Sequence, residues 1–163
     1  MGNICTDGIA MIYHGKAAID ALEAAEGILL TELERRTVWC EGYSTEEYLC
    51  DNGVKTSGCG QTGAWIGRPF REAFNHHADR AAARFPEWRL FPQHLKIELV
   101  QIEYRGDLGT SKKTCELIRA RKWEAAAVEF LDHAEFKDPD TSKGIKKRIL
   151  AVHYALMLME CQT

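Results

Sequence analysis

The sequence predicts an α+β protein that is mainly α, with a small β-hairpin lobe in its N-terminal third and a larger helical lobe behind it. Three observations support this prediction. Apolar residues recur at helical spacing over most of the chain, residues 43–63 are crowded with turn-forming residues, and 45% of the 163 residues are hydrophobic. We therefore expect a single domain over 1–163, divided into lobes of about 1–75 and about 76–163.

Two helical patterns open the chain. From Ala17, the apolar residues Ala18, Leu22 and Ala25 share one side, and Gly27 is the expected break. In the second pattern, Leu30, Leu33, Thr37 and Glu41 recur at helical spacing, and Gly42 is the expected stop. Glu41 is thus predicted at the last turn, on the apolar face. A carboxylate there must be paired, solvated by a cleft or protonated.

Residues 43–63 predict a hairpin followed by a loop. Tyr48 and Leu49 read as a short strand, Asp51-Asn52-Gly53 as a turn, and Val54 to Thr56 as the return strand. The segment Gly58 to Gly63 fits G-x-G-x-x-G but is expected to be a loop. A dinucleotide site is excluded because the motif needs a βαβ context that this sequence lacks.

The remainder is predicted to be punctuated by prolines and then mostly helical from Leu95. One helix carries Leu95, Leu99 and Ile102 and is broken by RGDLGTS at 105–111. A second, around Trp123 to Leu131, is the most clearly amphipathic. Turns are expected at 138–140 and 143–144, before a last helix from Ile145 to Met159. Its basic residues are interpreted as a solvated face, with a local basic patch as the alternative: Lys143, Lys146, Lys147 and Arg148.

Charge and composition exclude several function classes. The net charge of −3 gives no basic face for nucleic acid, and no apolar run is long enough for a transmembrane helix. The adjacent His76 and His77 diverge on a helix, no zinc-binding motif is present, and we expect no metal and no cofactor.

The cysteine count bears on the compartment. Six cysteines are compatible with disulfides in a secreted or exported protein, although no intact signal peptide is present; the alternative is six buried thiols: Cys5, Cys40, Cys50, Cys59, Cys115 and Cys161.

The spacing downstream of Glu41 suggests a catalytic constellation. Eight residues separate Glu41 from Cys50, and five more precede Thr56. A hairpin folded over the helix end would bring Cys50, Asp51 and Thr56 back towards Glu41. The glutamate could then protonate a leaving oxygen while hairpin residues hold a water. The structural alternative is a helix-terminal glutamate bonded to Thr56.

This order of residues resembles the catalytic signature of phage-type lysozymes. The hairpin text resembles that family's pattern Y-x-x-x-x-G-x-x-T-x-G-x-G-x-T, from Tyr48 to Thr62. RKWEAAAVEFLDHAEF and GIKKRI resemble its closing helices. LVQIEYRGDLG and EFLDHAEFKDP also resemble the pesticin-like muramidases.

The resemblance implies a two-lobed lysozyme-like fold and cleavage of the β-1,4 bond between N-acetylmuramic acid and N-acetylglucosamine in bacterial peptidoglycan. It places Glu41 at the general acid, Cys50 at an Asp/Cys position and Thr56 at the threonine that positions water. It assigns substrate binding to Gly58, Gln61, Tyr104 and Arg105. We expect a monomer with no stable membrane insertion.

Several departures leave alternatives open. The second catalytic position is Cys50, with Asp51 beside it, and a neutral thiol is a poor base. Gln61 stands where the family more often has a histidine, and Glu26-Gly27 is a second Glu-Gly pair, so Glu26 is an alternative acid. The functional alternatives are a lytic transglycosylase acting on the same bond and a lysozyme-like protein that binds peptidoglycan without cutting it.

Overall fold

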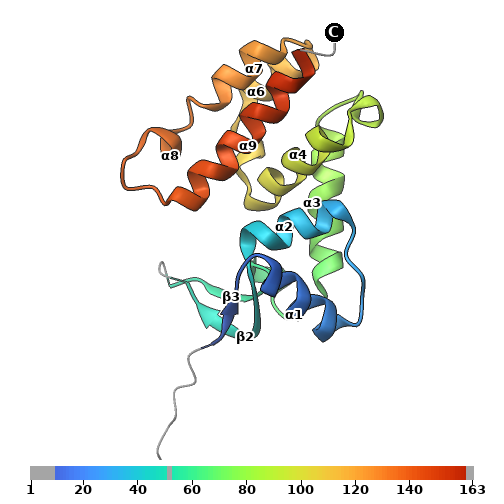
Figure 1. Ribbon diagram of the computed structural model, residues 1–163, viewed down its shortest axis with the longest axis vertical. Helices are drawn as coiled ribbons and strands as arrows, with labels where there is room; N and C mark the ends of the chain where they lie inside the picture. Colours follow the sequence, from blue (N-terminus) through green and yellow to red (C-terminus); the bar gives the residue numbers. More distant parts are fainter. Residues whose placement is uncertain (1–9, 51–52, 161–163) are drawn as a thin grey trace, which may run out of the picture.

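The computed structural model describes residues 10–50 and 53–160. Its N-terminal part combines two helices with a small antiparallel sheet (Figure 1). The elements are β1 (Ile12–Tyr13), α1 (Lys16–Glu26), α2 (Glu32–Glu41), β2 (Tyr43–Leu49), β3 (Lys55–Gly58), β4 (Gln61–Thr62) and the 3₁₀ helix η1 (Gly63–Trp65). Helices α1 and α2 end at the predicted glycines, Gly27 and Gly42.

The sheet is larger than the hairpin predicted from the sequence. Its strands lie in the order β1-β2-β3-β4, all antiparallel. Strand β2 begins at Tyr43, directly after α2, and pairs with both β1 and β3. The prediction of a loop over 58–63 was wrong, because a tight turn at Cys59-Gly60 returns the chain as β4, where Gln61 pairs with Ser57. These antiparallel strands leave the glycine motif without the βαβ unit of a dinucleotide site.

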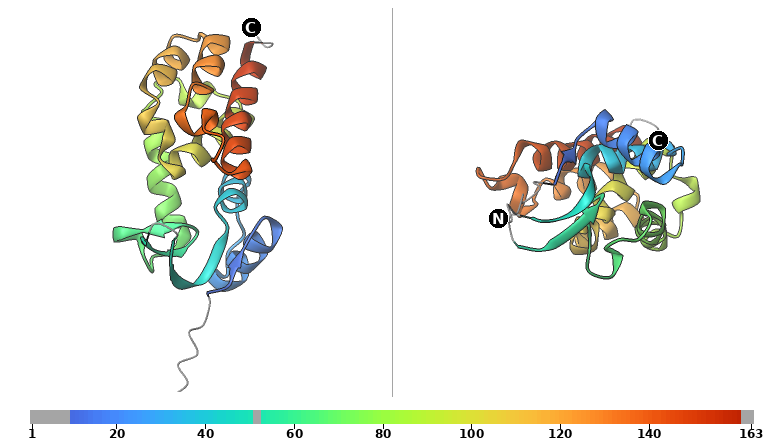
Figure 2. Two further views of the ribbon diagram at one scale, coloured as in Figure 1. Left: turned by 90° about the vertical axis from the view of Figure 1, so that its left-hand side faces the viewer. Right: turned by 90° about the horizontal axis from the view of Figure 1, so that it is seen from below.

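Helix α3 (Phe70–Ala83) connects the two parts of the molecule and was not predicted as a helix. It runs from the sheet to the upper helices (Figures 1 and 2). The lobe boundary expected near residue 75 falls in the middle of α3, so this one helix belongs to both lobes. Its buried side chains are Phe70, Ala73, Phe74 and Ala81.

The C-terminal part is entirely helical among the described residues. It contains η2 (Trp88–Leu90), α4 (Gln93–Arg105), α5 (Asp107–Thr110), α6 (Lys112–Arg119), α7 (Trp123–Phe130), α8 (Ala134–Lys137) and α9 (Lys143–Glu160). The segment 105–111 includes the short helix α5 and is not only a break. Lys143 and Gly144 begin α9 and do not form a turn, because the Ser142 Oγ accepts a hydrogen bond from the Ile145 N–H at 3.3 Å and caps the helix.

One cluster of buried apolar side chains runs through both parts, from Ala18 and Leu22 in α1 to Ile149 and Leu156 in α9. Helix α4 lies at its centre and packs on α2, α3 and α9. The cysteines within the described residues, Cys40, Cys50, Cys59 and Cys115, are all free thiols, so the disulfides considered above do not form among them; Cys5 and Cys161 lie outside. None of the described helices is long and apolar enough to span a membrane.

Candidate active site

Glu41 is the last residue of a helix that is fixed at both ends. A capping box starts α2: the Thr31 N–H donates to the Glu34 carboxylate at 2.7 Å, and the Glu34 N–H donates to the Thr31 hydroxyl. At the other end Gly42 has a φ of 78°, and a Cβ there would lie 2.7 Å from the Tyr13 carbonyl oxygen of β1. Only glycine fits this position, so the chain turns sharply from α2 into β2 beside Glu41.

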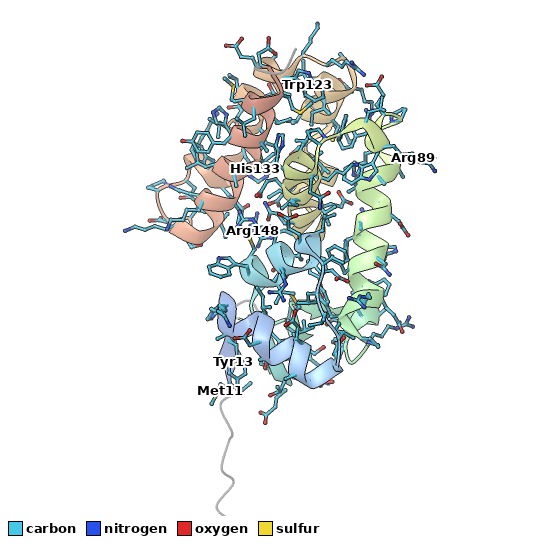
Figure 3. All side chains as sticks on the ribbon, turned by 45° about the vertical axis from the view of Figure 1, so that its right-hand side comes forward. Met11, Tyr13, Arg89, Trp123, His133 and Arg148 are labelled. Carbon is cyan, nitrogen blue, oxygen red and sulfur yellow. The ribbon has the colours of Figure 1, made fainter. Side chains whose placement is uncertain are left out.

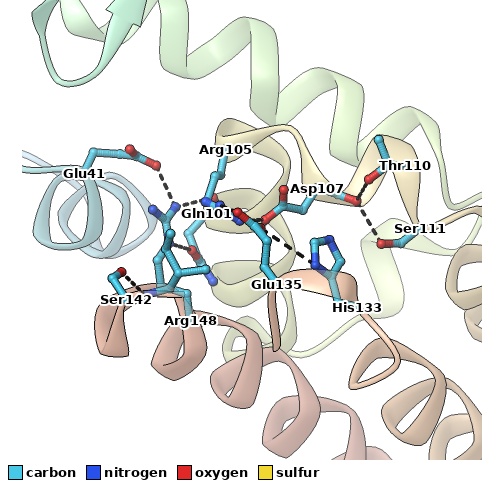
Figure 4. Close-up of polar contacts among 11 residues, drawn as sticks. Glu41, Gln101, Arg105, Asp107, Thr110, Ser111, His133, Glu135, Ser142 and Arg148 are labelled. Atoms are coloured by element: carbon cyan, nitrogen blue, oxygen red, sulfur yellow. Dashed lines mark hydrogen bonds and ion pairs between the residues drawn. The ribbon is translucent and has the colours of Figure 1, made fainter. Parts of the chain in front are cut away.

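The Glu41 carboxylate is held by an arginine from the far end of the sequence. Arg148 Nη2 in α9 donates to Glu41 Oε1 at 2.6 Å. The same guanidinium donates to Gln101 of α4, from Nε to the side-chain Oε1 at 2.8 Å and from Nη2 to the backbone carbonyl at 3.1 Å. Figure 4 shows Arg148 between Glu41 and Gln101, and Figure 3 places it between α9 and α2. Three helices therefore position one carboxylate.

Gln101 extends this arrangement into a closed network. Its side chain has 0% exposure, and its Nε2 donates to Glu98 Oε2 at 3.2 Å. Glu98 in turn accepts from Arg36 Nε at 3.1 Å and Nη2 at 3.3 Å. Because Arg36 and Glu41 belong to the same helix, the network leaves α2 and returns to it. Buried polar groups with all their partners in place give a rigid site, whereas removing one member is costly.

Neither Arg148 nor Gln101 was predicted from the sequence to belong to the site. The interpretation of Arg148 as part of a solvated face was wrong, since it is 8% exposed. Its position relative to Val152 and Ala155 was a usable signal, because residues spaced by four and seven share one face of a helix, and those two are buried. Gln101 likewise lies between Val100 and Ile102 in the most buried stretch of α4.

The second carboxylate oxygen of Glu41 is differently placed. Among the described residues, no hydrogen-bond donor reaches Oε2. A Cβ on Gly60, whose φ is 70°, would lie 3.3 Å from this atom. The Glu41 side chain retains 17% exposure. One oxygen is thus fixed by Arg148, while the other faces the Gly60 turn of the sheet.

Cys50 and Thr56 are brought together at the end of the hairpin. Cys50 Sγ lies 2.9 Å from Thr56 Oγ1, and the Thr56 hydroxyl donates to the Val54 carbonyl at 3.1 Å. The thiol is therefore the donor in the first contact. Thr56 is only 2% exposed, whereas Cys50 is half-buried. Asp51, the alternative to Cys50, lies outside the described residues.

Tyr48 lies beside this pair in the sheet. Its partner across the sheet is Thr56. Burial raises the pKa of the Tyr48 hydroxyl, and the Glu41 carboxylate and a hydrogen bond with the Cys50 thiol raise it further.

Among the residues predicted to bind substrate, Gly58, Gln61 and Tyr104 shape the turn beside Glu41. Gly58 has a φ of 54°. The Gln61 amide is buried and donates to the carbonyls of Trp65 at 3.1 Å and Arg68 at 2.8 Å. The Tyr104 hydroxyl donates to the Cys59 carbonyl at 2.9 Å. These contacts hold the Gly60 turn against α4.

Arg105, the fourth predicted substrate-binding residue, faces a different cluster. It pairs with Asp107 and, at 2.6 Å, with Glu135, whose second oxygen lies 3.8 Å from His133 Nδ1 (Figure 4). Asp107, His133 and Glu135 lie close enough together to hold a metal ion. The Arg105 guanidinium already pairs with both carboxylates, and its hydrogen bond is the main cause of the lowered pKa of Glu135. The cluster therefore joins α8 to the end of α4.

Glu26, the alternative acid, has a hydrogen-bond partner of its own. Its Oε1 accepts a hydrogen bond from the Phe70 N–H at 2.8 Å, at the first turn of α3. The two Glu-Gly pairs therefore contact different parts of the molecule.

Several pockets lie near these residues, and two of them differ in size and character. One, of about 180 Å³, borders the Gly60 turn and is lined by Gly60, Gln61, Thr62, Trp65, Ala73, His76, His77, Arg80 and Tyr104. A larger one, of about 510 Å³, is mainly apolar and lies between α2, α4 and α9, where Trp39 and Leu158 line it. None of Glu41, Cys50 and Thr56 lines either of these two pockets.

Comparison with solved structures supports this fold. The chain is similar to the crystal structure of the active form of P1 phage endolysin Lyz, with a TM-score of 0.61 and 12% sequence identity over 88% of this chain and 93% of that chain. No protein-family model matches the sequence, and no curated protein matches it. The chain therefore has the phage lysozyme-like fold predicted from its hairpin and closing helices.

Proposed function

We propose that this protein is a peptidoglycan hydrolase, an N-acetylmuramidase, that uses Glu41 as its general acid. The observation that carries the proposal is the Glu41–Arg148 ion pair, which fixes a helix-terminal carboxylate beside the sheet on a fold shared with a phage endolysin. The substrate would be the β-1,4 bond between N-acetylmuramic acid and N-acetylglucosamine. Because peptidoglycan lies outside the cytoplasmic membrane, the proposal requires the protein to be exported.

The two oxygens of Glu41 have separate roles in this mechanism. Oε1 accepts from Arg148 at 2.6 Å, which fixes the plane and direction of the carboxyl group. Oε2, which meets no donor among the described residues, is the oxygen that carries the proton and delivers it to the leaving glycosidic oxygen. Arg148 is therefore a positioning residue.

Cys50 and Thr56 would act on the attacking water. Thr56 is almost completely buried, so its hydroxyl orients the Cys50 thiol and does not itself reach the water. The sulfur lone pairs of Cys50 then remain available to accept a hydrogen bond from a water on the other side of the sugar ring. In a single displacement, that water attacks the anomeric carbon, the glycosidic C–O bond breaks and Glu41 protonates the departing oxygen. The attacking water releases its extra proton to the solvent, from which the Glu41 carboxylate is reprotonated.

Because Cys50 is a thiol and not a carboxylate, two alternative functions also fit the site. In a lytic transglycosylase, Glu41 acts first as acid and then as base while a hydroxyl of the sugar itself closes a ring, so no water-activating base is needed. In a peptidoglycan-binding protein, the same fold holds the glycan without cutting it. Both alternatives tolerate a cysteine at this position better than hydrolysis does.

The products of purified peptidoglycan distinguish the three functions. We expect the intact protein to release new reducing ends, and Glu41→Gln to lose about 10²–10⁴-fold of this activity while unfolding at a similar temperature. Anhydro-sugar ends in place of reducing ends would establish the transglycosylase. Sedimentation with the cell wall without any product would establish the binding protein. Equal activity of both proteins would mean that Glu41 is not the acid.

A further inference from the structure

The apolar pocket of about 510 Å³ between α2, α4 and α9 has the size and lining of a ligand site. Small-molecule sites occupy roughly 300–1,000 Å³ and are lined mainly by apolar side chains with a few polar groups. Ile97 and Ala155 line this pocket beside three large side chains that stay exposed: Trp39 at 52%, Tyr154 at 61% and Leu158 at 51%. Large apolar side chains gathered around one concavity mark a binding surface, whereas single exposed ones do not.

Among the described residues, the charged side chains that line the apolar pocket leave one carboxylate without a partner. Arg35 pairs with Glu23 at 2.6 Å. Arg36 pairs with Glu98 at 3.1 Å, so neither guanidinium is free to bind an anion. Glu32 also lines the pocket and is exposed, and its carboxylate has no ion pair or hydrogen bond with any described residue. A cationic ligand therefore complements the pocket, whereas an anionic one would be repelled.

Helices α2 and α4 run in the same direction along the apolar pocket. Arg36 of α2 contacts Glu98 of α4. Further along both helices, Glu41 of α2 and Gln101 of α4 contact the same guanidinium, that of Arg148. Positions one turn earlier in the two helices therefore also lie side by side.

Two hydrogen-bond acceptors meet at one end of the apolar pocket. Glu32 and His94 both line the pocket. Each comes one helical turn before a member of the Arg36–Glu98 pair. The Nε2 atom of His94 is buried and has no hydrogen-bond partner among the described residues, which is uncommon for a polar group in a native protein. A neutral imidazole accepts a hydrogen bond at one ring nitrogen, and a carboxylate only accepts. This end of the pocket therefore suits a positively charged donor.

We propose that the apolar pocket binds a small amphipathic amine. Its protonated amino group would lie between Glu32 and His94. Trp39 comes seven residues after Glu32 on the same face of α2, which corresponds to about 10 Å along the helix. The apolar body of the ligand would extend over this distance and pack on the indole ring of Trp39. This inference does not rest on the proposed function, because Glu41 does not line the pocket.

Three probes that differ at one end test the charge of the ligand. Phenylhexylamine is a phenyl ring on a six-carbon chain that ends in an amino group, which is protonated at about pH 7. Phenylhexanol and phenylhexanoate end in a hydroxyl and a carboxylate instead. In calorimetric titrations we expect saturable binding of phenylhexylamine, about tenfold weaker binding of phenylhexanol, and still weaker binding of phenylhexanoate.

Two substitutions locate the ligand in the pocket. Glu32→Gln should reduce the difference in affinity between the amine and the alcohol to less than about threefold, because the carboxylate no longer attracts the amino group. Glu124→Gln is the matched control, since Glu124 is also exposed and lies in the first turn of a helix, α7, but does not line the pocket. Trp39→Ala should weaken binding of the amine and of the alcohol alike by about tenfold, through loss of the aromatic contact. The melting temperature without ligand checks that each variant folds.

The outcomes separate this site from the proposed activity. Absence of saturable amine binding, or equal affinity for the three probes, would overturn the site. A preference for the amine that persisted in Glu32→Gln, or full affinity in Trp39→Ala, would place the ligand elsewhere and overturn the assignment. Glu41→Gln should bind phenylhexylamine as the wild type does, whether or not the protein cleaves peptidoglycan.

Discussion

The two Glu-Gly pairs of this protein occupy the same local position and have different surroundings. Glu26 and Glu41 each end a helix, and each is followed by a glycine with positive φ, at 64° for Gly27 and 78° for Gly42. Glu26 accepts from the backbone N–H of Phe70 and so fixes the start of α3. Glu41 accepts from the side chain of Arg148, which is itself held by Gln101.

The difference shows what distinguishes a structural carboxylate from a candidate catalytic one. A backbone N–H at the start of a helix gains a partner from Glu26, and this stabilises the fold. Glu41 instead receives a charged partner from another lobe on one oxygen and leaves the other oxygen facing the Gly60 turn. A helix-end glutamate is therefore informative only when its tertiary partners are known.

The largest expected difference between the two sites is in activity. Glu41→Gln should reduce reducing-end release by about 10²–10⁴-fold, whereas Glu26→Gln should stay close to wild type, because a glutamine oxygen can still accept from the Phe70 N–H. Both variants keep the shape of the side chain, so each controls for the other. Loss of activity in Glu26→Gln with an unchanged melting temperature would reverse the assignment.

The next largest effect is on stability, at Arg148. Arg148→Met leaves Glu41 and the fully buried Gln101 without a shared donor, and we expect a loss of about 3 kcal/mol in the free energy of unfolding. Urea titration measures it. The control is Lys16→Met, which removes an exposed ion pair with Asp20 and should change little. A similar small effect at Arg148 would show that the closed network does not stabilise the fold.

A smaller effect is expected at Cys50, where the thiol contacts Thr56. Cys50→Ala should lower kcat by about tenfold to a hundredfold, because the attacking water loses a hydrogen-bond acceptor. Cys50→Asp should retain or raise kcat above about pH 5, because a carboxylate is the stronger base there. Full activity of Cys50→Ala would favour the transglycosylase, which needs no such group.

The smallest effect is expected at Glu34, which lies in the first turn of α2, the helix that ends at Glu41. Burial acts to raise the pKa of Glu34, but hydrogen bonds from Arg71 and Thr31 and the Arg71 charge together hold it below its ordinary value. A lowered pKa stabilises the fold above the ordinary glutamate range, and this contribution is lost as the pH falls through the folded value.

Glu34→Gln should therefore lower the urea midpoint at about pH 7 by less than Arg148→Met does. The difference from wild type should shrink as the pH is lowered below about 4, because Glu34 then becomes protonated in the wild type as well. A difference that stayed constant between about pH 7 and pH 3 would show that the ionised form of Glu34 makes no special contribution.

Features that depend on neighbours in the chain could be predicted from the amino-acid sequence. Periodicity, caps and turn residues predict the ends of α1 and α2 and place Glu41 at a helix terminus. They also predict the paired strands around Thr56. The Cys50–Thr56 contact also lies within this local range, since both residues belong to one hairpin. Helix α3 could not be predicted from the sequence, because its apolar residues lie among histidines, arginines and alanines and give only a weak helical pattern.

The groups that contact Glu41 are set by how the helices pack and could not be predicted from the sequence. Arg148 lies 107 residues away in the sequence and is surrounded by lysines that are chemically similar, so no local pattern singles it out. The pocket of Trp65, His76, His77 and Tyr104 likewise joins the end of the sheet to α3 and α4. The physical reason is that hydrogen bonding and ring contacts require distances of a few ångströms, and for residues far apart in sequence only the packing of the helices sets those distances.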